Sequence, residues 1–347
     1  MAHCKHRRHL GPAGTIATGL LAGAAFAGCA AGVDDGPGAA AGGTGGSGGA
    51  PTTSTHPPPP GSDTSADDGL ALLAEFRALA GLGQPQIDDA MSAGCAAHLD
   101  YLIWESTTGG KGVCFLSHTE DDHDNPYYAP EHEAAGKDSV IACGVGSDGR
   151  QTLAQAVDVW MNSLYHRLPL LHPGLAKIGY ASKSGYNCIN YRSGTDKTVV
   201  VTPSTPVLWP PGGMADVPRS FAGHEVPCPT KVDNPMASTG MDCAASGFIV
   251  TASWFGLGGW TPPFGHADRS QVRLVDEDSG SEIPLLVWYA DGLDGHDPAP
   301  RAVAESVALV PAASLPFNKT LRAEVDVVLN EEPVNATWRF VTGVRAK

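Results

Sequence analysis

Two histidines in segments without helical periodicity are the side chains of this chain best suited to chemistry at a site. His118 lies in a Ser/Thr/Asp-rich segment, 117–125, that precedes a proline, so we expect it on a loop. His166 follows an apolar helical stripe and precedes Pro169, which forbids further regular helix, so we expect it on a turn. A loop and a turn can face each other across one groove, and the sequence therefore predicts a site lined by both imidazoles.

Hydrolysis is one alternative for these side chains. Ser163 and His166 are three residues apart, as a nucleophile and its base could be, but a capping serine and the next turn would show the same spacing. The chain has no G-x-S-x-G elbow, no H-E-x-x-H pair and no recognisable acid to orient a triad. A peptide or ester hydrolase, metal-dependent or serine-type, stays an alternative with His118, His166 and Ser163 as its candidate catalytic residues.

A metal ion is another alternative. A stable zinc site needs three or four protein ligands, so two imidazoles alone would bind weakly. Glu120, Asp122 or His123 could complete a set with His118 and His166, and this acidic loop offers the oxygen ligands that calcium prefers. The predicted divalent cation is therefore zinc or calcium.

A helix over 152–164 must position the second histidine. Thr152 followed by Gln155 predicts a capping box at its start. Two earlier stripes, over 72–80 and 91–102, predict two further helices, and the second places His98 on an apolar face, where we expect a core histidine satisfied by a neighbour. The stripe of the 152–164 helix recurs at helical spacing through Leu153, Ala156, Val157, Trp160, Met161 and Leu164.

Short strands should follow these helices. Residues 177–181, 186–191 and 198–201 are strand candidates separated by Ser-Gly turns. Helices and short strands in this order indicate an α/β domain.

The order of these segments resembles the CAP superfamily, which comprises cysteine-rich secretory proteins, antigen 5 and pathogenesis-related proteins, in its bacterial form. The resemblance covers roughly residues 70–191. It is carried by Phe76-Arg77-Ala78-Leu79-Ala80-Gly81, Cys95-Ala96-Ala97-His98-Leu99-Asp100-Tyr101, Ser117-His118, Trp160-x-x-Ser163-x-x-His166-Arg167 and Ile178-Gly179-Tyr180. It implies an α-β-α sandwich, in which a small sheet lies between helices.

The resemblance also implies a groove with two histidines and two carboxylates, where some members bind a divalent metal. His118 and His166 carry over by motif. Residues 136–142 correspond to the family's G-E-N-I-A element, but Ser139 stands in place of the glutamate, and Ser163 stands where many eukaryotic members have the second one. The candidate groove residues are His118, Glu120, Ser139, Trp160, Ser163 and His166.

The chain from residue 204 onward changes character. Short alternating runs with turn punctuation indicate a β-sandwich, and the clearest strand, 321–327, is answered by Ala336, Trp338 and Phe340. This part, 204–347, resembles the immunoglobulin-like modules of bacterial surface proteins. Such a module could adhere or contact carbohydrate through Trp254, Phe255, Trp260 and Phe264, or serve as a spacer with partly buried aromatics.

The N-terminal segments predict export. Residues 1–28 begin with a basic run followed by a short apolar stretch, as in a signal peptide. Phe26-Ala27-Gly28-Cys29 resembles a lipobox, so we expect Cys29 to be lipidated, with ordinary cleavage and secretion as the alternative. Residues 29–66 are rich in Gly, Ser, Thr and Pro and predict a disordered linker. A CAP domain over 67–203 follows.

Cysteine usage agrees with export. Without Cys4 and Cys29, an even set of cysteines remains and predicts disulfides. The set is Cys95, Cys114, Cys143, Cys188, Cys228 and Cys243. Pairing neighbours along the chain gives Cys95–Cys114, Cys143–Cys188 and Cys228–Cys243. No C-x-x-C pair supports zinc instead.

The charge excludes one class of partner. A formal net charge of −15 repels phosphate backbones, so nucleic acid is not expected. The chain is thus predicted to be an exported, lipid-anchored protein of the cell envelope or surface, or a secreted one. We expect a non-enzymatic CAP-domain protein that binds a small apolar ligand or an extended peptide or glycan between His118 and His166, with adhesion or a structural role as a further alternative.

Overall fold

The protein is described by a computed structural model that covers residues 66–144, 150–223, 225, 228–230, 243–256, 272–289, 292–293, 306–329 and 332–343. The predicted signal peptide, the lipidated Cys29, the linker up to residue 65, and the aromatics Trp260 and Phe264 lie outside these residues. All of the described residues belong to one compact unit. None of the helices in these ranges is long and apolar enough to cross a membrane.

A four-stranded sheet of order β1-β3-β4-β2 forms the centre of the first half. Its strands are β1 (Gln86–Ile87), β2 (Ser139–Cys143), β3 (Lys177–Lys183) and β4 (Tyr186–Asn190). The β3–β4 and β2–β4 pairs are antiparallel, and β1 joins β3 in parallel. The sequence predicted β3 and β4 correctly but was wrong for 198–201. These residues follow a turn at Asp196, to which Thr198 and Val199 donate, and Val201 donates to the carbonyl of Phe255 without forming a strand.

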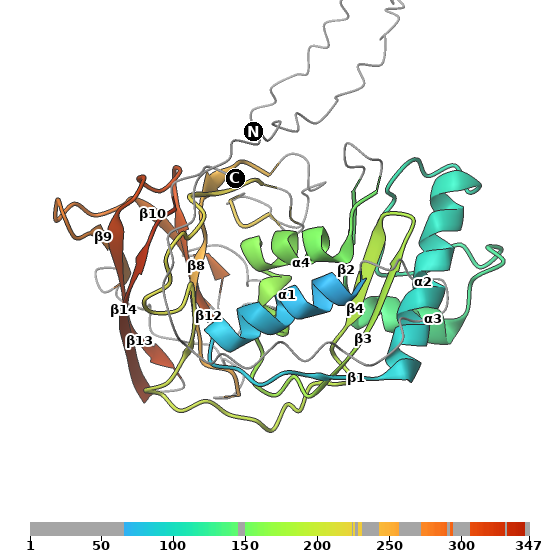
Figure 1. Cartoon of the computed structure of the whole chain (residues 1–347), viewed down its shortest axis with the longest axis horizontal. Coiled ribbons are helices and arrows are strands. Elements are labelled where there is room, and N and C mark those ends of the chain that lie inside the picture. Colours follow the sequence, from blue (N-terminus) through green and yellow to red (C-terminus); the bar gives the residue numbers. More distant parts are fainter. Residues whose placement is uncertain are drawn as a thin grey trace, which may run out of the picture. The chain divides into compact units, whose positions relative to one another are not determined.

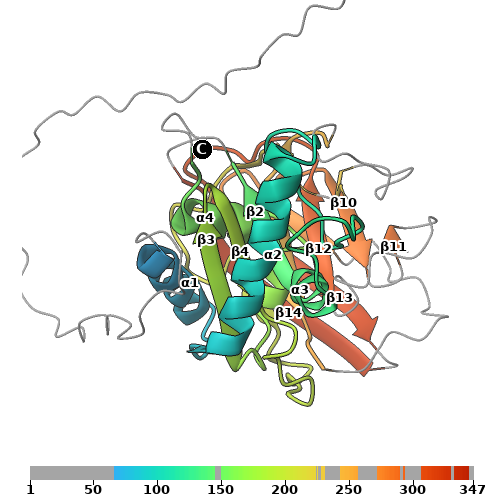
Figure 2. The ribbon, with the colours of Figure 1, turned by 90° about the vertical axis from the view of Figure 1, so that its right-hand side faces the viewer.

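Helices cover both faces of this sheet (Figure 1). Along β2, Val140 packs with the helices α1 (Ala66–Leu79) and α4 (Leu153–Asn162), while Ile141 points the other way and packs with α2 (Asp89–Thr107). Figure 2 shows α2 running along β3 and β4, and α3 (Pro130–Lys137) packs beside α2. Because successive strand residues point to opposite faces, this alternation produces three layers, and the α/β prediction is confirmed.

The predicted capping box is present at the start of α4. The backbone N–H of Gln155 donates to the Thr152 hydroxyl at 3.2 Å, and that of Thr152 donates to the Gln155 side chain at 2.9 Å. The helix ends at Asn162 because Ser163 adopts an extended conformation. The prediction that Pro169 forbids further helix was wrong, because one helical turn, α5 (Arg167–Leu170), contains this proline. A proline is tolerated in the first turn of a helix because the N–H that it lacks would have no intrahelical partner there.

The second half is β-rich, as predicted. One sheet has the order β11-β10-β12-β8-β5, a second has the order β14-β13-β9, and β6 pairs with β7. The strands are β5 (Val207–Trp209), β6 (Ser220–Phe221), β7 (Ser246–Gly247), β8 (Val250–Ser253), β9 (Val272–Asp276), β10 (Leu285–Tyr289), β11 (Gly292–Leu293), β12 (Ser306–Pro311), β13 (Thr320–Leu329) and β14 (Glu332–Val341). The expected pairing of the closing strands is confirmed, with Ala323 opposite Trp338 and Leu321 opposite Phe340.

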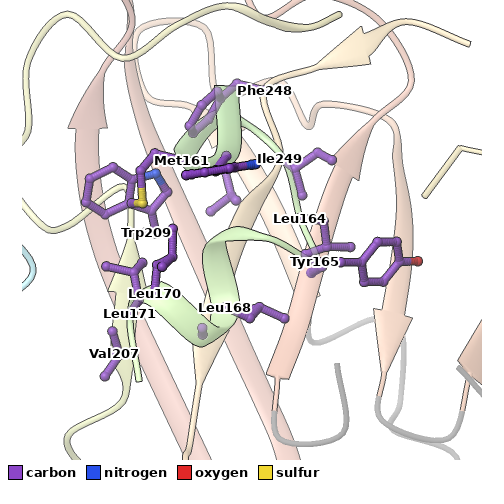
Figure 3. Close-up of a cluster of buried hydrophobic side chains, with 14 of the residues drawn as sticks. Met161, Leu164, Tyr165, Leu168, Leu170, Leu171, Val207, Trp209, Phe248 and Ile249 are labelled. Atoms are coloured by element: carbon purple, nitrogen blue, oxygen red, sulfur yellow. The ribbon is translucent and has the colours of Figure 1, made fainter. Parts of the chain in front are cut away.

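One hydrophobic core joins the two halves. Buried side chains of the α4–α5 region, among them Met161 and Leu170, belong to the same cluster as Trp209, Phe248 and Ile249 from beyond residue 203 (Figure 3). Full burial of one large apolar side chain contributes about 1.5–3 kcal/mol, so this shared core is a strong connection. The division into a unit of 67–203 and another of 204–347 stays a prediction.

Two of the three expected disulfide pairings were wrong. The structure joins Cys95 to Cys188 and Cys114 to Cys143, while Cys228–Cys243 is confirmed. Cys95 lies on α2 and Cys188 on β4, and the helix packs against that strand, so residues 93 positions apart in sequence become neighbours. Distance along the chain therefore misled the pairing.

Candidate functional site

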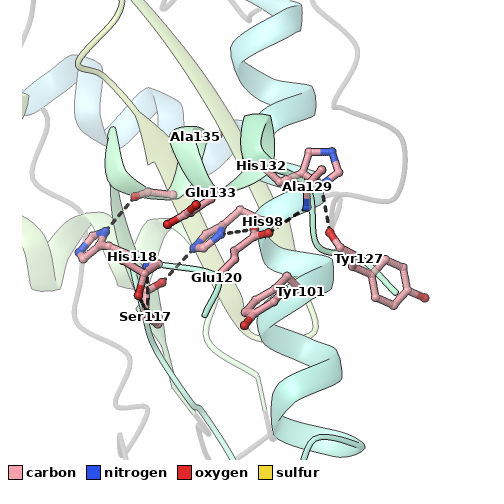
Figure 4. A network of polar contacts seen from close by, with 12 residues as sticks. His98, Tyr101, Ser117, His118, Glu120, Tyr127, Ala129, His132, Glu133 and Ala135 are labelled. Atoms are coloured by element: carbon pink, nitrogen blue, oxygen red, sulfur yellow. Dashed lines mark hydrogen bonds and ion pairs between the residues drawn. The ribbon is translucent and has the colours of Figure 1, made fainter. Parts of the chain in front are cut away.

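His118 lies on the loop between α2 and α3 and is tied to α3 through one ring nitrogen (Figure 4). Its Nδ1–H donates to the carbonyl oxygen of Gly136 at 2.8 Å. A carbonyl can only accept, so a neutral His118 carries its proton on Nδ1. Nε2 has no hydrogen-bond partner in the described part of the chain, and the residue is exposed to solvent.

A buried network beneath His118 holds this loop in place. His98, on α2, contacts the carboxylate of Glu120 through Nδ1 at 2.8 Å and donates from Nε2 to the carbonyl of Ser117 at 2.9 Å. The second Glu120 oxygen accepts from the backbone of Ala129 at 3.3 Å. His98 and Glu120 are both fully buried, so the expected core histidine with a satisfying neighbour is confirmed.

The close packing around His98 explains a glycine in α3. A Cβ atom at Gly136 would lie 2.5 to 2.7 Å from three atoms of the His98 ring, closer than real contacts allow. Gly136 therefore lets α3 approach α2 while its carbonyl reaches His118. One residue thus connects the buried histidine with the exposed one.

The electrostatic environment favours a neutral His118. Although the residue as a whole is exposed, neighbouring protein atoms partly desolvate its ring, and this desolvation is the largest effect that lowers its pKa. The Gly136 hydrogen bond raises the pKa, whereas the positive charges that His166 and His98 would carry lower it. The influence of His166 on His118 is the observation that brings the two predicted histidines into one electrostatic neighbourhood.

His166 is held by a carboxylate that comes from much later in the chain. Glu225 Oε1 lies 3.0 Å from His166 Nδ1, and the Ser163 hydroxyl oxygen lies 3.1 Å from the same nitrogen. The single hydroxyl hydrogen of Ser163 is donated to the carbonyl of Trp160 at 2.9 Å. The His166 side chain is 21% exposed, and its Nε2 has no hydrogen-bond partner among the residues that the structure describes.

The Glu225 carboxylate is buried and also binds the backbone at the start of α5. Oε2 accepts from the N–H of Leu164 at 2.7 Å, and Oε1 accepts from those of Tyr165 at 2.5 Å and His166 at 3.2 Å. These N–H groups lie on the turn between α4 and α5, before the first residue of α5, so neither helix pairs them and the carboxylate satisfies them. Glu225 fixes both the turn and the imidazole that the turn carries.

Arg167 supplies the opposite charge nearby. Its buried guanidinium donates to the carbonyls of Met161 at 3.1 Å and Ile249 at 3.0 Å, and it lies over the ring of Phe248 at 5.6 Å. Burial lowers the pKa of Arg167 to about 9, and the charge of Glu225 opposes that shift, so the guanidinium stays charged at neutral pH. His166 and Arg167 thus both bind residues of the β-rich half.

With the site defined, comparison with known proteins identifies the first half. Residues 70–201 match the family described as CAP, Cysteine-rich secretory protein family. Residues 70–201 are a CAP domain. No curated protein and no solved structure matches the chain. The resemblance seen in the sequence is confirmed, and Glu225 lies beyond the last matched residue.

The other predicted groove residues of the CAP domain are engaged in its interior. Ser139 is buried, donates to the carbonyl of Ala135 at 2.6 Å and packs against the sulfur of Cys188. Trp160 is buried and its Nε1–H points to the carbonyl of Ile141 at 3.4 Å. Glu120 and Ser163 are buried in the contacts described above. His118 and His166 remain as the two predicted residues with a ring nitrogen left for a ligand.

The donor set of the CAP site consists of two imidazoles. Among the described residues, no group of three or more His, Cys, Asp or Glu side chains is arranged to hold a metal ion. Glu120, the predicted third ligand, directs its carboxylate to His98 and Ala129. What the site offers chemically is a pair of Nε2 atoms that can accept hydrogen bonds.

Sequence reasoning missed Glu225. It follows Gly223 in a short segment after β6, outside every periodic run, and no spacing rule connects it with His166. The available signal was indirect: the two glutamates that the family places in its groove are replaced by Ser139 and Ser163. A carboxylate from another part of the chain could have been sought for that reason.

Proposed function

We propose that this exported protein binds an extended extracellular ligand between His118 and His166 of its CAP domain. The observation that carries the proposal is shared by the two histidines. Each has Nδ1 bound to an acceptor of the protein, Gly136 or Glu225, and each leaves Nε2 for a ligand. Three disulfides support an oxidising, extracytoplasmic compartment.

The chemistry of the two Nε2 atoms favours a particular ligand class. A neutral imidazole with its proton on Nδ1 accepts a hydrogen bond at Nε2. Two such acceptors select a ligand with N–H or O–H donors, as an extended peptide or glycan has, over one that is entirely apolar. Arg192, exposed and close enough to lower the pKa of His118, is paired with Asp138 at 3.3 Å at this edge.

We further propose how the protein is anchored and how its domains are arranged. Export through a signal peptide at 1–28, lipidation of Cys29 and a linker over 29–66 would hold the CAP domain, 67–203, away from a membrane of the cell envelope. The region 204–347 would be an immunoglobulin-like sandwich that supports the CAP domain. The latter role is supported by Trp254 and Phe255, which are buried and therefore not displayed for adhesion.

Thermal melts test the binding function. The probes are a soluble peptide, a soluble oligosaccharide, palmitate and Zn²⁺, each added to the intact chain. At a hundredfold excess over Kd, binding stabilises the folded state by about 2.7 kcal/mol. His118→Ala and His166→Ala should each abolish the shift, while His132→Ala, on the other side of α3, should retain it (Figure 4). Absence of a shift with every probe would contradict the proposal, and a shift with palmitate alone would reverse the ligand class.

Hydrolysis is the second candidate, favoured by the carboxylate that orients His166. An imidazole bound at Nδ1 by a carboxylate has the arrangement of a general base acting through Nε2. Ser163 does not fit as its nucleophile, because the hydroxyl faces Nδ1 and donates to Trp160. A water would have to be activated instead. Turnover of a peptide or ester that survives in the double variant His118→Ala/His166→Ala would exclude this mechanism.

A further inference from the structure

The carboxylate that binds His166 comes from outside the CAP domain. We propose that Glu225 is a positioning residue: it holds the proton of His166 on Nδ1 and so makes Nε2 an acceptor for the ligand. The site between His118 and His166 is then incomplete without the region that follows the CAP domain. The effect on ligand binding rests on the proposed function, but the effect on the proton does not.

The hydrogen-bond inventory around His166 assigns the proton. Ser163 has one hydroxyl hydrogen, and Trp160 receives it, so the Ser163 oxygen meets Nδ1 with a lone pair. Glu225, when ionised, is also an acceptor only. Two acceptors at 3.0 and 3.1 Å require a hydrogen on Nδ1, and a neutral imidazole then has none on Nε2.

Of the two acceptors, Glu225 is the stronger. Hydrogen bonds that involve an ionised partner are roughly twice as strong as neutral ones. The buried carboxylate accepts hydrogen bonds from three backbone N–H groups, those of Leu164, Tyr165 and His166, and the charge of Arg167 lies nearby. It is therefore a fixed negative group aimed at one nitrogen of the ring.

The segment that carries Glu225 is itself held on both sides. Before it, β6 pairs with β7, and after it the Cys228–Cys243 disulfide closes the loop. The indole of Trp288 donates to the carbonyl of Pro229 at 2.6 Å, which connects the segment to β10. These contacts lie outside the CAP domain, so the β-rich half determines where the carboxylate stands.

Glu225→Gln is the variant that tests this role. The amide keeps the size of the carboxylate, but its NH₂ group must replace one of the two accepting oxygens. With its oxygen at the Oε1 position, the amide opposes only the N–H of Leu164 and meets Nδ1 as a neutral acceptor, roughly half as strong as the carboxylate. Turned the other way, it places a donor against Tyr165, His166 and Nδ1–H. Glu282→Gln is the matched control, because Glu282 is exposed and its side chain pairs with Arg273 at 3.4 Å, away from His166 in the sequence and outside its hydrogen bonds.

The measurement is the tautomer of His166 in the full-length chain at pH 8, read from ring ¹⁵N chemical shifts and assigned by their loss in His166→Ala. Native protein and Glu282→Gln should show the Nδ1–H form, and Glu225→Gln should shift the population toward Nε2–H. Affinity for the peptide or oligosaccharide that shifts the melt should fall about tenfold or more, as for other outer-shell carboxylates on histidines. An unchanged tautomer both in Glu225→Gln and in Glu225→Ala, which removes the acceptor altogether, would overturn the proposal.

A second variant decides the matter if Glu225→Gln does not fold. Ser163→Ala leaves the carboxylate as the sole acceptor at Nδ1 and should retain the Nδ1–H form. Loss of that form in Ser163→Ala would assign the positioning role to the serine and overturn the proposal. A tautomer that responds to Glu225 in a protein that binds none of the probes would instead refute the binding function and leave the positioning role established.

Discussion

The two sides of the candidate site are built by different means. On the His118 side, the supporting groups come from the CAP domain itself, through His98, Glu120 and Gly136. On the His166 side, the carboxylate of Glu225 arrives from 59 residues further along the chain and from outside the domain. Both sides achieve the same result, an imidazole bound at Nδ1. The difference shows that one histidine is positioned by its domain and the other by the contact between two halves of the molecule.

Because the two histidines are supported by different parts of the chain, a substitution that disturbs one of them should leave the other unchanged. A variant within the CAP network should alter His118 and leave the tautomer of His166 unchanged. A variant in the Glu225 segment should do the reverse.

Replacement of His98 by alanine should have the largest effect. It leaves the buried Glu120 without its imidazole partner and opens space between α2 and α3. Removing one partner of a buried pair that contains a carboxylate costs about 3–5 kcal/mol, so the free energy of unfolding in urea should fall by that amount. His132→Ala, which changes a histidine near the surface of α3, should cost little. A loss below 1 kcal/mol for His98→Ala would mean that the network does not hold the loop.

Removal of the Cys228–Cys243 disulfide should have an intermediate effect on stability, and it should disturb the His166 side of the site. The bond joins residues 15 positions apart, and a loop of that length contributes about 3 kcal/mol in the chain-entropy account. Replacing both cysteines by serine should destabilise the protein by about that amount and broaden the ring signals of His166, because Glu225 precedes Cys228 closely. Removal of Cys114–Cys143 is the control: it should destabilise the protein yet leave the His166 signals sharp.

The smallest of the expected effects is a loss of stability in acid, at a contact between the two halves of the molecule. Burial lowers the pKa of His172 to about 4, and its ring packs against Phe255 at 4.7 Å. The folded state thus favours the neutral ring, while the unfolded chain takes up a proton below its ordinary pKa of 6.5. Stability is therefore complete above pH 6.5 and declines as the pH falls toward 4, by about 2 kcal/mol once partial exposure is allowed for.

The loss of stability in acid is measured as the difference between the free energies of unfolding in urea at pH 7 and at pH 4.5. His172→Gln should reduce the difference between the two values, because glutamine does not titrate. His123→Gln, a change in a histidine that stacks on Tyr128 within the CAP domain, serves as the control. An identical pH dependence in His172→Gln and the native protein would show that the contact with Phe255 is not the sensitive one.

Local patterns in the sequence were sufficient for several elements. The capping box at Thr152 and the stripe that follows it predicted α4, because such signals involve residues within one or two helical turns. Alternation of apolar residues predicted the pairing of β13 and β14 for the same kind of reason. The motif around His118 and His166 predicted the CAP domain and its two imidazoles.

Only the tertiary structure decided which distant groups meet. The partner of Cys95 was set by the packing of α2 on β4, and the carboxylate for His166 was set by a segment of the β-rich half that carries no periodic signal. Ser139 and Ser163 were expected in a groove but are buried, since their hydroxyls bind backbone carbonyls nearby. Sequence patterns report contacts between near neighbours, whereas these choices depend on surfaces that come together only when the whole chain is folded.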